Sequence, residues 1–156
     1  MVTVPKTYLG FDFGSKSIGI ASGESVTQYA TPLALIKVAN NSIPWEKLIQ
    51  YINDYQPDAL VVGWPCDAQD KPLPLAGRVK HFAQQLHEHS QLPIYLENEH
   101  LTSKEAKQRL HQRYGKKRIT EHKIDDMAAC IILESFLQAH TKQQPFLSNN
   151  CSNQEK

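Results

Sequence analysis

The sequence predicts an α/β fold in which a mixed five-stranded sheet carries helices on both faces. Three extended segments come first in the chain, with no helical pattern between them. Helical and extended patterns then alternate, which is typical of strands that add to a sheet in parallel. One of the later extended segments, residues 58–63, is almost continuously apolar, as expected for a strand covered on both faces.

Length and composition favour one folded domain. The chain has 156 residues, of which 40% are hydrophobic and 21% charged, and this balance excludes a disordered or collagen-like protein. We predict a single domain over residues 1–140, followed by a polar and flexible tail over residues 141–156. No apolar run approaches the ~20 residues that span a bilayer, and the first residues lack an apolar stretch, so we expect no signal peptide before the first strand. With three widely spaced cysteines, these features predict a cytoplasmic protein without a membrane partner.

The first three extended segments are predicted to form an antiparallel unit. Residues 8–14 form a strand that ends at Gly14, and residues 18–22 follow after a short turn, as in a hairpin. The third segment, residues 29–38, contains Pro32 near its start. Because proline cannot donate a hydrogen bond to a neighbouring strand, we expect an edge or a bulge there.

Helices and strands alternate through the middle of the chain. Apolar residues at helical spacing follow Pro44, which suits a first helical turn, and Pro57 ends that helix. The next predicted elements are a strand at residues 58–63, a loop at 64–74, a helix at 75–89 and a strand at 94–96.

Two helices are predicted after the last strand. Thr102 begins a Thr-x-x-Glu capping box, so a helix should start there and stop at Gly115. Residues 115–121 lack an apolar pattern and are expected to be mobile, and a final helix should cover residues 123–140.

Positive charge is concentrated in residues 104–123. This segment holds eight Lys or Arg residues and two Glu residues, whereas the rest of the chain holds nine basic and fourteen acidic residues. Such an uneven distribution of charge can steer a polyanion to one face of the molecule. A solvated helix and loop is the alternative interpretation of the same pattern.

Three acidic residues interrupt apolar surroundings. Asp12 lies near the end of the first strand, and Asp125 heads a helical stripe that is otherwise apolar. Glu99 follows the strand at residues 94–96, where open α/β sheets build their sites, but Glu97 would share its face and the pattern does not choose between them. Each acid also has a structural alternative. Asp12 could cap a turn, Glu99 could be a solvated loop residue, and Asp125 could interact with the helix dipole.

A divalent cation would explain three inward-facing acids. Bare carboxylates held together would repel one another and raise their pKa values. Oxygen ligands suit Mg²⁺ or Mn²⁺, and one or two such ions can promote hydrolysis of a phosphodiester. The basic segment lies in sequence between Glu99 and Asp125, so acid cluster and polyanion-binding segment together predict a nuclease.

Four short motifs occur in order along the chain. They are Asp12-Phe13-Gly14-Ser15-Lys16-Ser17-Ile18-Gly19, Gly63-Trp64-Pro65, Asn98-Glu99-His100-Leu101-Thr102 and Ile124-Asp125-Asp126-Met127-Ala128-Ala129. With these motifs the chain resembles the YqgF/RuvX-type pre-16S rRNA nucleases over about residues 8–140. That family has the RNase H-like fold and is related to Holliday junction resolvases.

The resemblance implies a function and its residues. It implies an endonuclease that processes the 5′ end of pre-16S rRNA, as a monomer or homodimer, with Mg²⁺ or Mn²⁺ held by Asp12, Glu99 and Asp125. This carry-over favours Glu99 over Glu97. The residues expected to contact nucleic acid are Lys16, His100, Lys104, Arg113, Lys116, Lys117, Arg118 and Lys123.

The chain departs from the family pattern near the expected metal ligands. Asn98 stands where an aspartate is usual and His100 where an arginine is usual, while Ser17 replaces an arginine and Trp64 a leucine. Because histidine can be neutral near pH 7, phosphate contact at residue 100 is expected to be weaker or pH-dependent.

Three other functions fit parts of the sequence. A resolvase of four-way DNA junctions would use the same chemistry on structured DNA, and a non-catalytic nucleic-acid-binding module would fit the altered residues around Glu99. The Asp12-Phe13-Gly14-Ser15 segment also looks like the phosphate loop of sugar kinases and actin-like ATPases. Those proteins carry a second such loop, which this chain lacks.

Overall fold

The fold is known from a computed structural model. It describes residues 5–40, 42–66, 69, 71, 73–99, 108, 112, 116–139 and 145–148, excluding the side chains of residues 116–126. The elements are β1 (Thr7–Phe13), β2 (Ser17–Glu24), β3 (Ala30–Lys37), α1 (Trp45–Tyr55), β4 (Ala59–Trp64), α2 (Ala76–Ser90), β5 (Ile94–Asn98) and α4 (Lys116–Ala139). Among the described residues, no helix has the length and apolar character needed to cross a membrane.

The strands form one mixed sheet in the order β3-β2-β1-β4-β5. β1 pairs antiparallel with β2, and β2 pairs antiparallel with β3, whereas β4 runs parallel to both β1 and β5. The predicted five-stranded mixed sheet is therefore confirmed. β1 is the central strand of the sheet, because it pairs with β2 on its antiparallel side and with β4 on its parallel side.

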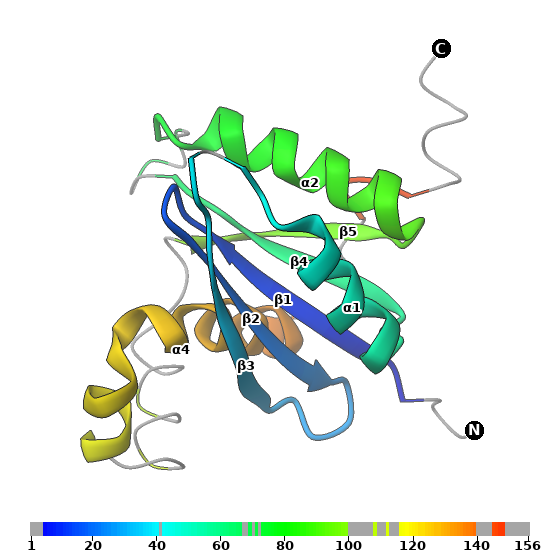
Figure 1. Cartoon of the computed structure of the whole chain (residues 1–156). Helices are drawn as coiled ribbons and strands as arrows, with labels where there is room; N and C mark the ends of the chain where they lie inside the picture. The colour runs from blue at the N-terminus through cyan, green and yellow to red at the C-terminus, as the bar shows by residue number, and fades with distance from the viewer. Residues whose placement is uncertain are drawn as a thin grey trace.

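Helices cover the two faces of the sheet separately (Figure 1). Helices α1 and α2 pack on one face over a core to which the β1 residues Leu9, Phe11 and Phe13 contribute. Helix α4 crosses the other face, where Ala129, Ile132 and Leu133 belong to a second core. Alternation along β1 explains this division, because successive side chains point to opposite faces.

The expected irregularity at Pro32 is present. β3 is an edge strand, and its pairing with β2 shifts register between Ile20 and Ala21, so that Ala21 lies opposite Pro32. At an edge or a bulge a strand residue can lack a ladder hydrogen bond, so proline, which has no backbone N–H, is tolerated there.

The carboxyl-terminal third differs in part from the prediction. Helix α4 begins at Lys116 rather than near residue 123, because residues that are polar apart from Ile119 can be helical without an apolar stripe. The predicted helix at residues 102–115 lies outside the described residues, apart from 108 and 112.

The predicted tail also makes contact with the domain. Ile94 of β5 exchanges backbone hydrogen bonds with Phe146 and Leu147, and both of these side chains pack against the α1 and α2 core. A short apolar pair in a polar segment is thus enough to hold residues 145–148 at the free edge of β5.

Candidate functional site

The site begins at the carboxyl end of β1. Asp12 alternates with the buried Phe11 and Phe13, so its side chain lies on the opposite face of the sheet, which is the face of α4. Gly10 marks the same face, since a Cβ atom there would lie 2.9 Å from Leu133 Cβ on α4. Asp12 is only partly buried, and it lies just beyond the last β1 residue that pairs with β4, which is Phe11.

Glu99 reaches the same face from the other side of β4. It follows β5 directly, and its side chain lies against Gly63 of β4. A Cβ atom on Gly63 would lie 3.0 Å from Glu99 Oε2 and 2.5 Å from Ile132 Cδ1 of α4. The missing side chain at residue 63 therefore leaves the space that the Glu99 carboxylate occupies between β5 and β1.

Glu97 has a different environment from Glu99. It is 3% exposed, and its Oε2 accepts a hydrogen bond of 2.8 Å from Ser135 Oγ on α4. Its neighbour on the same face, Tyr95, packs against Phe136 with ring centroids 4.9 Å apart. Glu97 thus joins β5 to α4, whereas Glu99 extends past that contact towards Asp12.

Burial and the nearby charge of Asp12 change the acidity of Glu99. Loss of solvent around the carboxyl group is the larger cause, and repulsion by Asp12 adds to it, so that the pKa of Glu99 rises to about 7. Two carboxylates that interact in this way form an electronegative point at the end of the sheet. Their oxygen-only donor set is suited to Mg²⁺ or Mn²⁺, which would remove the repulsion.

The raised pKa of Glu99 predicts a pH-dependent stability difference. The folded protein binds this proton more tightly than the unfolded chain, so its stabilising effect is complete below the ordinary value of 4.5 and is lost as pH rises through about 7. In metal-free buffer, Glu99→Gln should therefore raise the melting temperature, relative to wild type, more at about pH 8 than at about pH 5. Calorimetry that gave equal differences at the two pH values would contradict the assigned environment.

Asp125 lies on α4, but its side chain is outside the described residues. The backbone of α4 passes close to Gly10 at Ala129, and Ile132 approaches Gly63. Residue 125 is one helical turn before residue 129, on the same helical face. Its contribution to the site remains a prediction, and within the described part of the chain no group of three His, Cys, Asp or Glu residues could hold a metal ion.

The residues expected to bind nucleic acid are only partly described. Lys16 is exposed in the β1–β2 turn, four residues after Asp12 in the sequence, and its carbonyl oxygen accepts a hydrogen bond of 2.9 Å from Val38 N. The backbones of Lys116, Lys117, Arg118 and Lys123 lie in the first turns of α4, and His100, Lys104 and Arg113 lie outside the described residues.

One contact near Glu99 was not predicted from the sequence. The Cys66 thiol donates a hydrogen bond of 2.6 Å to Oδ1 of Asn98, the residue before Glu99. Cys66 follows β4 and Asn98 ends β5, so this bond joins the two segments that frame Glu99. Neither residue type nor spacing could indicate it, since the two residues are far apart in sequence.

Comparisons with known proteins agree with this architecture. A family model described as RuvX, Holliday junction resolvase, matches residues 6–139. The chain is 39% identical over 133 residues to a Pseudoalteromonas translucida protein named "Putative pre-16S rRNA nuclease", covering 85% of this chain and 89% of the relative. A Legionella pneumophila (strain Paris) protein of the same name is 40% identical, covering 84% of this chain and 94% of the relative.

Solved structures with the same fold have little sequence similarity to the chain. RuvC of T. thermophilus, in complex with a Holliday junction substrate, is 14% identical with a TM-score of 0.53, covering 83% of this chain and 92% of that one. The fowlpox virus resolvase, with Holliday junction DNA, is 14% identical with a TM-score of 0.56, covering 87% and 99%. These structures show that the fold is RNase H-like. With the family match over most of its length, the chain belongs to the RuvX family of nucleases.

Proposed function

We propose that the protein is a metal-dependent endonuclease whose metal ligands are Asp12, Glu99 and Asp125. The observation that carries the proposal is the approach of Glu99 to Asp12 across Gly63, which raises the pKa of Glu99 to about 7. A pair of mutually repelling carboxylates is costly without a cation, so the arrangement favours Mg²⁺ or Mn²⁺ at this point.

The proposed substrate is the 5′ region of pre-16S rRNA. Relatives that cover most of this chain carry the name of a nuclease for that RNA. The basic segment 104–123 is joined in sequence to Glu99 on one side and to Asp125 on the other. It would hold the phosphate backbone electrostatically beside the carboxylates, and binding should weaken steeply with salt. Such a substrate places the protein in the cytoplasm.

The proposed reaction is hydrolysis of one phosphodiester bond. Water attacks phosphorus, the bond to the leaving sugar oxygen breaks, and the leaving oxygen gains a proton. A bound divalent ion supplies activation of the water and stabilisation of the leaving oxygen. Asp12, Glu99 and Asp125 would hold that ion through carboxylate oxygens, and Lys16, which is exposed in the turn after β1, would contact a phosphate of the substrate.

A four-way DNA junction is the second candidate substrate. The family description and two structural neighbours with junction DNA favour it. Resolution of a junction needs two paired cuts and therefore a dimer. A protein that is monomeric during turnover and leaves junction DNA intact would exclude this candidate.

The test compares substrates and one variant under identical conditions. Wild type is incubated with a structured RNA carrying the 16S 5′ precursor and with a four-way DNA junction, each with Mg²⁺ or with EDTA. We expect RNA cleavage that needs Mg²⁺ and is lost in Asp12→Asn. The matched control is Asp54→Asn, because Asp54 is an exposed carboxylate on α1, which covers the opposite face of the sheet.

Two results would overturn the proposal. One is cleavage by Asp12→Asn at the wild-type rate, since the site would then not depend on this carboxylate. The other is RNA binding without turnover in Mg²⁺ and Mn²⁺, which would support the non-catalytic binding module.

A further inference from the structure

Exposed lysines lie around the end of the sheet at which β1 carries Asp12. Lys16 is exposed in the β1–β2 turn, and the exposed Lys37 ends β3, where it pairs with Ser17 of β2. The Lys16 carbonyl oxygen accepts a hydrogen bond of 2.9 Å from the backbone N–H of Val38. Because neighbouring strands lie about 4.8 Å apart, the two lysines leave the backbone from nearby positions.

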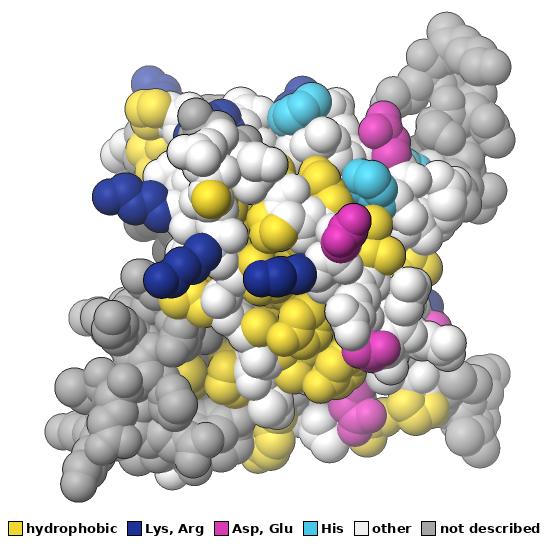
Figure 2. All heavy atoms as spheres, in the orientation of Figure 1, with side chains coloured by type: hydrophobic (Ala, Val, Ile, Leu, Met, Phe, Trp, Pro, Cys, Tyr) yellow, Lys and Arg dark blue, Asp and Glu magenta, His cyan; other side chains and the backbone are white. Residues whose placement is uncertain are grey.

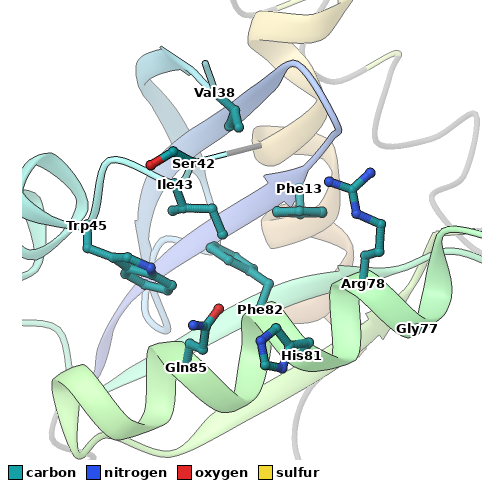
Figure 3. A pocket seen from close by; sticks show the side chains of 10 residues that line it. All are labelled: Phe13, Val38, Ser42, Ile43, Trp45, Gly77, Arg78, His81, Phe82 and Gln85. Carbon is teal, nitrogen blue, oxygen red and sulfur yellow. The ribbon is translucent and has the colours of Figure 1, made fainter. Parts of the chain in front are cut away.

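Helix α2 brings a third cation to the same end of the sheet. Arg78 is exposed, and its guanidinium carbon lies 5.8 Å from the centroid of the Phe13 ring, which ends β1. This distance is within the range of a cation–π contact, which holds the charge beside the end of β1. Figure 3 shows Arg78 beside Phe13, with His81 and Gln85 further along the same helix.

Lys16, Lys37 and Arg78 together form what we call the cationic rim. It runs from the edge strand β3, across the β1–β2 turn, to helix α2. The rim begins close to the carboxylates, because Phe13, over which Arg78 lies, follows Asp12 on β1.

The charge of the rim is not neutralised within the described part of the chain. There, none of its three cations forms an ion pair with a carboxylate, and no Asp or Glu lines the groove beside Arg78. On the face seen in Figure 2, Lys and Arg side chains lie mainly over the half that holds the β1–β2 turn, and Asp and Glu over the other half. Unpaired charges of one sign favour a polyanion.

The groove beside Arg78 offers no aromatic face to an unpaired base. Phe13 is 5% and Phe82 1% exposed, and Trp45 packs against both Phe82 and His89, with ring centroids 5.6 Å and 4.5 Å apart. Proteins that hold single strands without reading their sequence combine cations with aromatic side chains on which the bases stack. The rim has cations without accessible rings, so it suits a nucleic acid whose bases are already paired.

We propose that the cationic rim binds the phosphate backbone of a double-stranded segment next to the bond that is cut at Asp12 and Glu99. Contacts from Lys16, Lys37 and Arg78 to phosphates position the substrate without reading its sequence. This inference rests on the proposed nuclease function, because the bound segment must continue to the carboxylates. It extends the surface that contacts nucleic acid to β3 and α2.

The salt dependence of binding tests the rim without cleavage. The full chain is titrated in EDTA with a fluorescent duplex at several salt concentrations. Lys37→Gln and Arg78→Gln should each reduce the slope of log K against log salt by about 0.9, the contribution of one phosphate contact on a B-form duplex. The matched control is Lys6→Gln, because Lys6 is exposed and precedes β1 at the other end of that strand. This control should keep the wild-type slope.

A single strand of equal length identifies the kind of nucleic acid that the rim binds. Lys37→Gln and Arg78→Gln should weaken binding of the duplex more than binding of the single strand. Two duplexes of unrelated sequence should lose affinity equally, since phosphates carry no sequence information. Wild-type salt slopes in both variants, or equal losses of affinity for single strand and duplex, would overturn the proposal.

The nuclease site and the cationic rim fail in different ways. If Asp12→Asn cleaves at the wild-type rate while Lys37→Gln and Arg78→Gln reduce the salt slope, the carboxylate site is wrong and the rim stands. If Asp12→Asn is inactive while both rim variants bind the duplex with the wild-type slope, the rim is wrong and the carboxylate site stands.

Discussion

Replacement of Glu99 by glutamine is expected to reduce metal-dependent cleavage more than about a hundredfold, because loss of residues that only support metal ligands already costs about 10–100-fold. Glutamine keeps the size of the side chain but removes the negative charge. The variant should also bind Mg²⁺ more weakly, and the loss should not be recovered at higher pH, since an amide does not ionise. Single-turnover cleavage and calorimetric titration of Mg²⁺ measure the two effects.

Glu97→Gln is the matched control for this experiment. Glu97 lies two residues before Glu99 and has the same chemistry, but its Oε2 accepts a hydrogen bond from Ser135. The glutamine oxygen can accept that bond as well, so this variant should keep most of its cleavage. The opposite result, with Glu97→Gln inactive and Glu99→Gln active, would assign the metal ligand to Glu97.

Gly63→Ala is expected to lower both cleavage and stability. The added Cβ would lie 2.5 Å from Ile132 Cδ1 and 3.0 Å from Glu99 Oε2, so both side chains must move. Overpacking of this kind in a buried strand typically costs about 1–3 kcal/mol. Displacement of the Glu99 carboxylate should reduce cleavage further than the loss of stability explains.

A second substitution separates these two effects. Ile132→Val removes the Cδ1 atom that the new Cβ would meet, so Gly63→Ala with Ile132→Val should regain much of the lost melting temperature. The close contact between the added Cβ atom at residue 63 and Glu99 remains in the double variant, so its cleavage should stay low. Recovery of full cleavage in the double variant would show that the effect of residue 63 is only a matter of core packing. Ile132→Val alone serves as the control and should cost about 0.5–1.5 kcal/mol.

Patterns that are local in sequence predicted most of the fold. Alternation of apolar residues around Asp12 and the spacing of Leu48 and Ile52 each identify an element from neighbouring residues. Pro32 likewise predicted an edge or a bulge, because proline has no backbone N–H and cannot donate a hydrogen bond to a neighbouring strand. The start of α4 at Lys116 was missed because its first turns are polar apart from Ile119 and so show no apolar stripe.

The candidate site was predicted less completely. Residue type and position named Asp12 and Glu99, but sequence pattern alone left Glu97 as an equal alternative to Glu99. The structure distinguishes their environments through two distant residues, Ser135 and Gly63. The bond from Cys66 to Asn98 depends on the same parallel pairing of β4 and β5.

The sequence by itself determined the succession of strands and helices along the chain, the concentration of basic residues in positions 104–123, and the identity of the acids that interrupt apolar patterns. These properties are written in spacing along one chain. Only the tertiary structure decided that Glu99 lies over Gly63 near Asp12, and that Phe13, Trp45 and Arg78 share a groove. The physical reason is that burial, repulsion between carboxylates and the shape of a cavity depend on distances through space. These distances are set by the order of the strands within the sheet and by the packing of the helices on it.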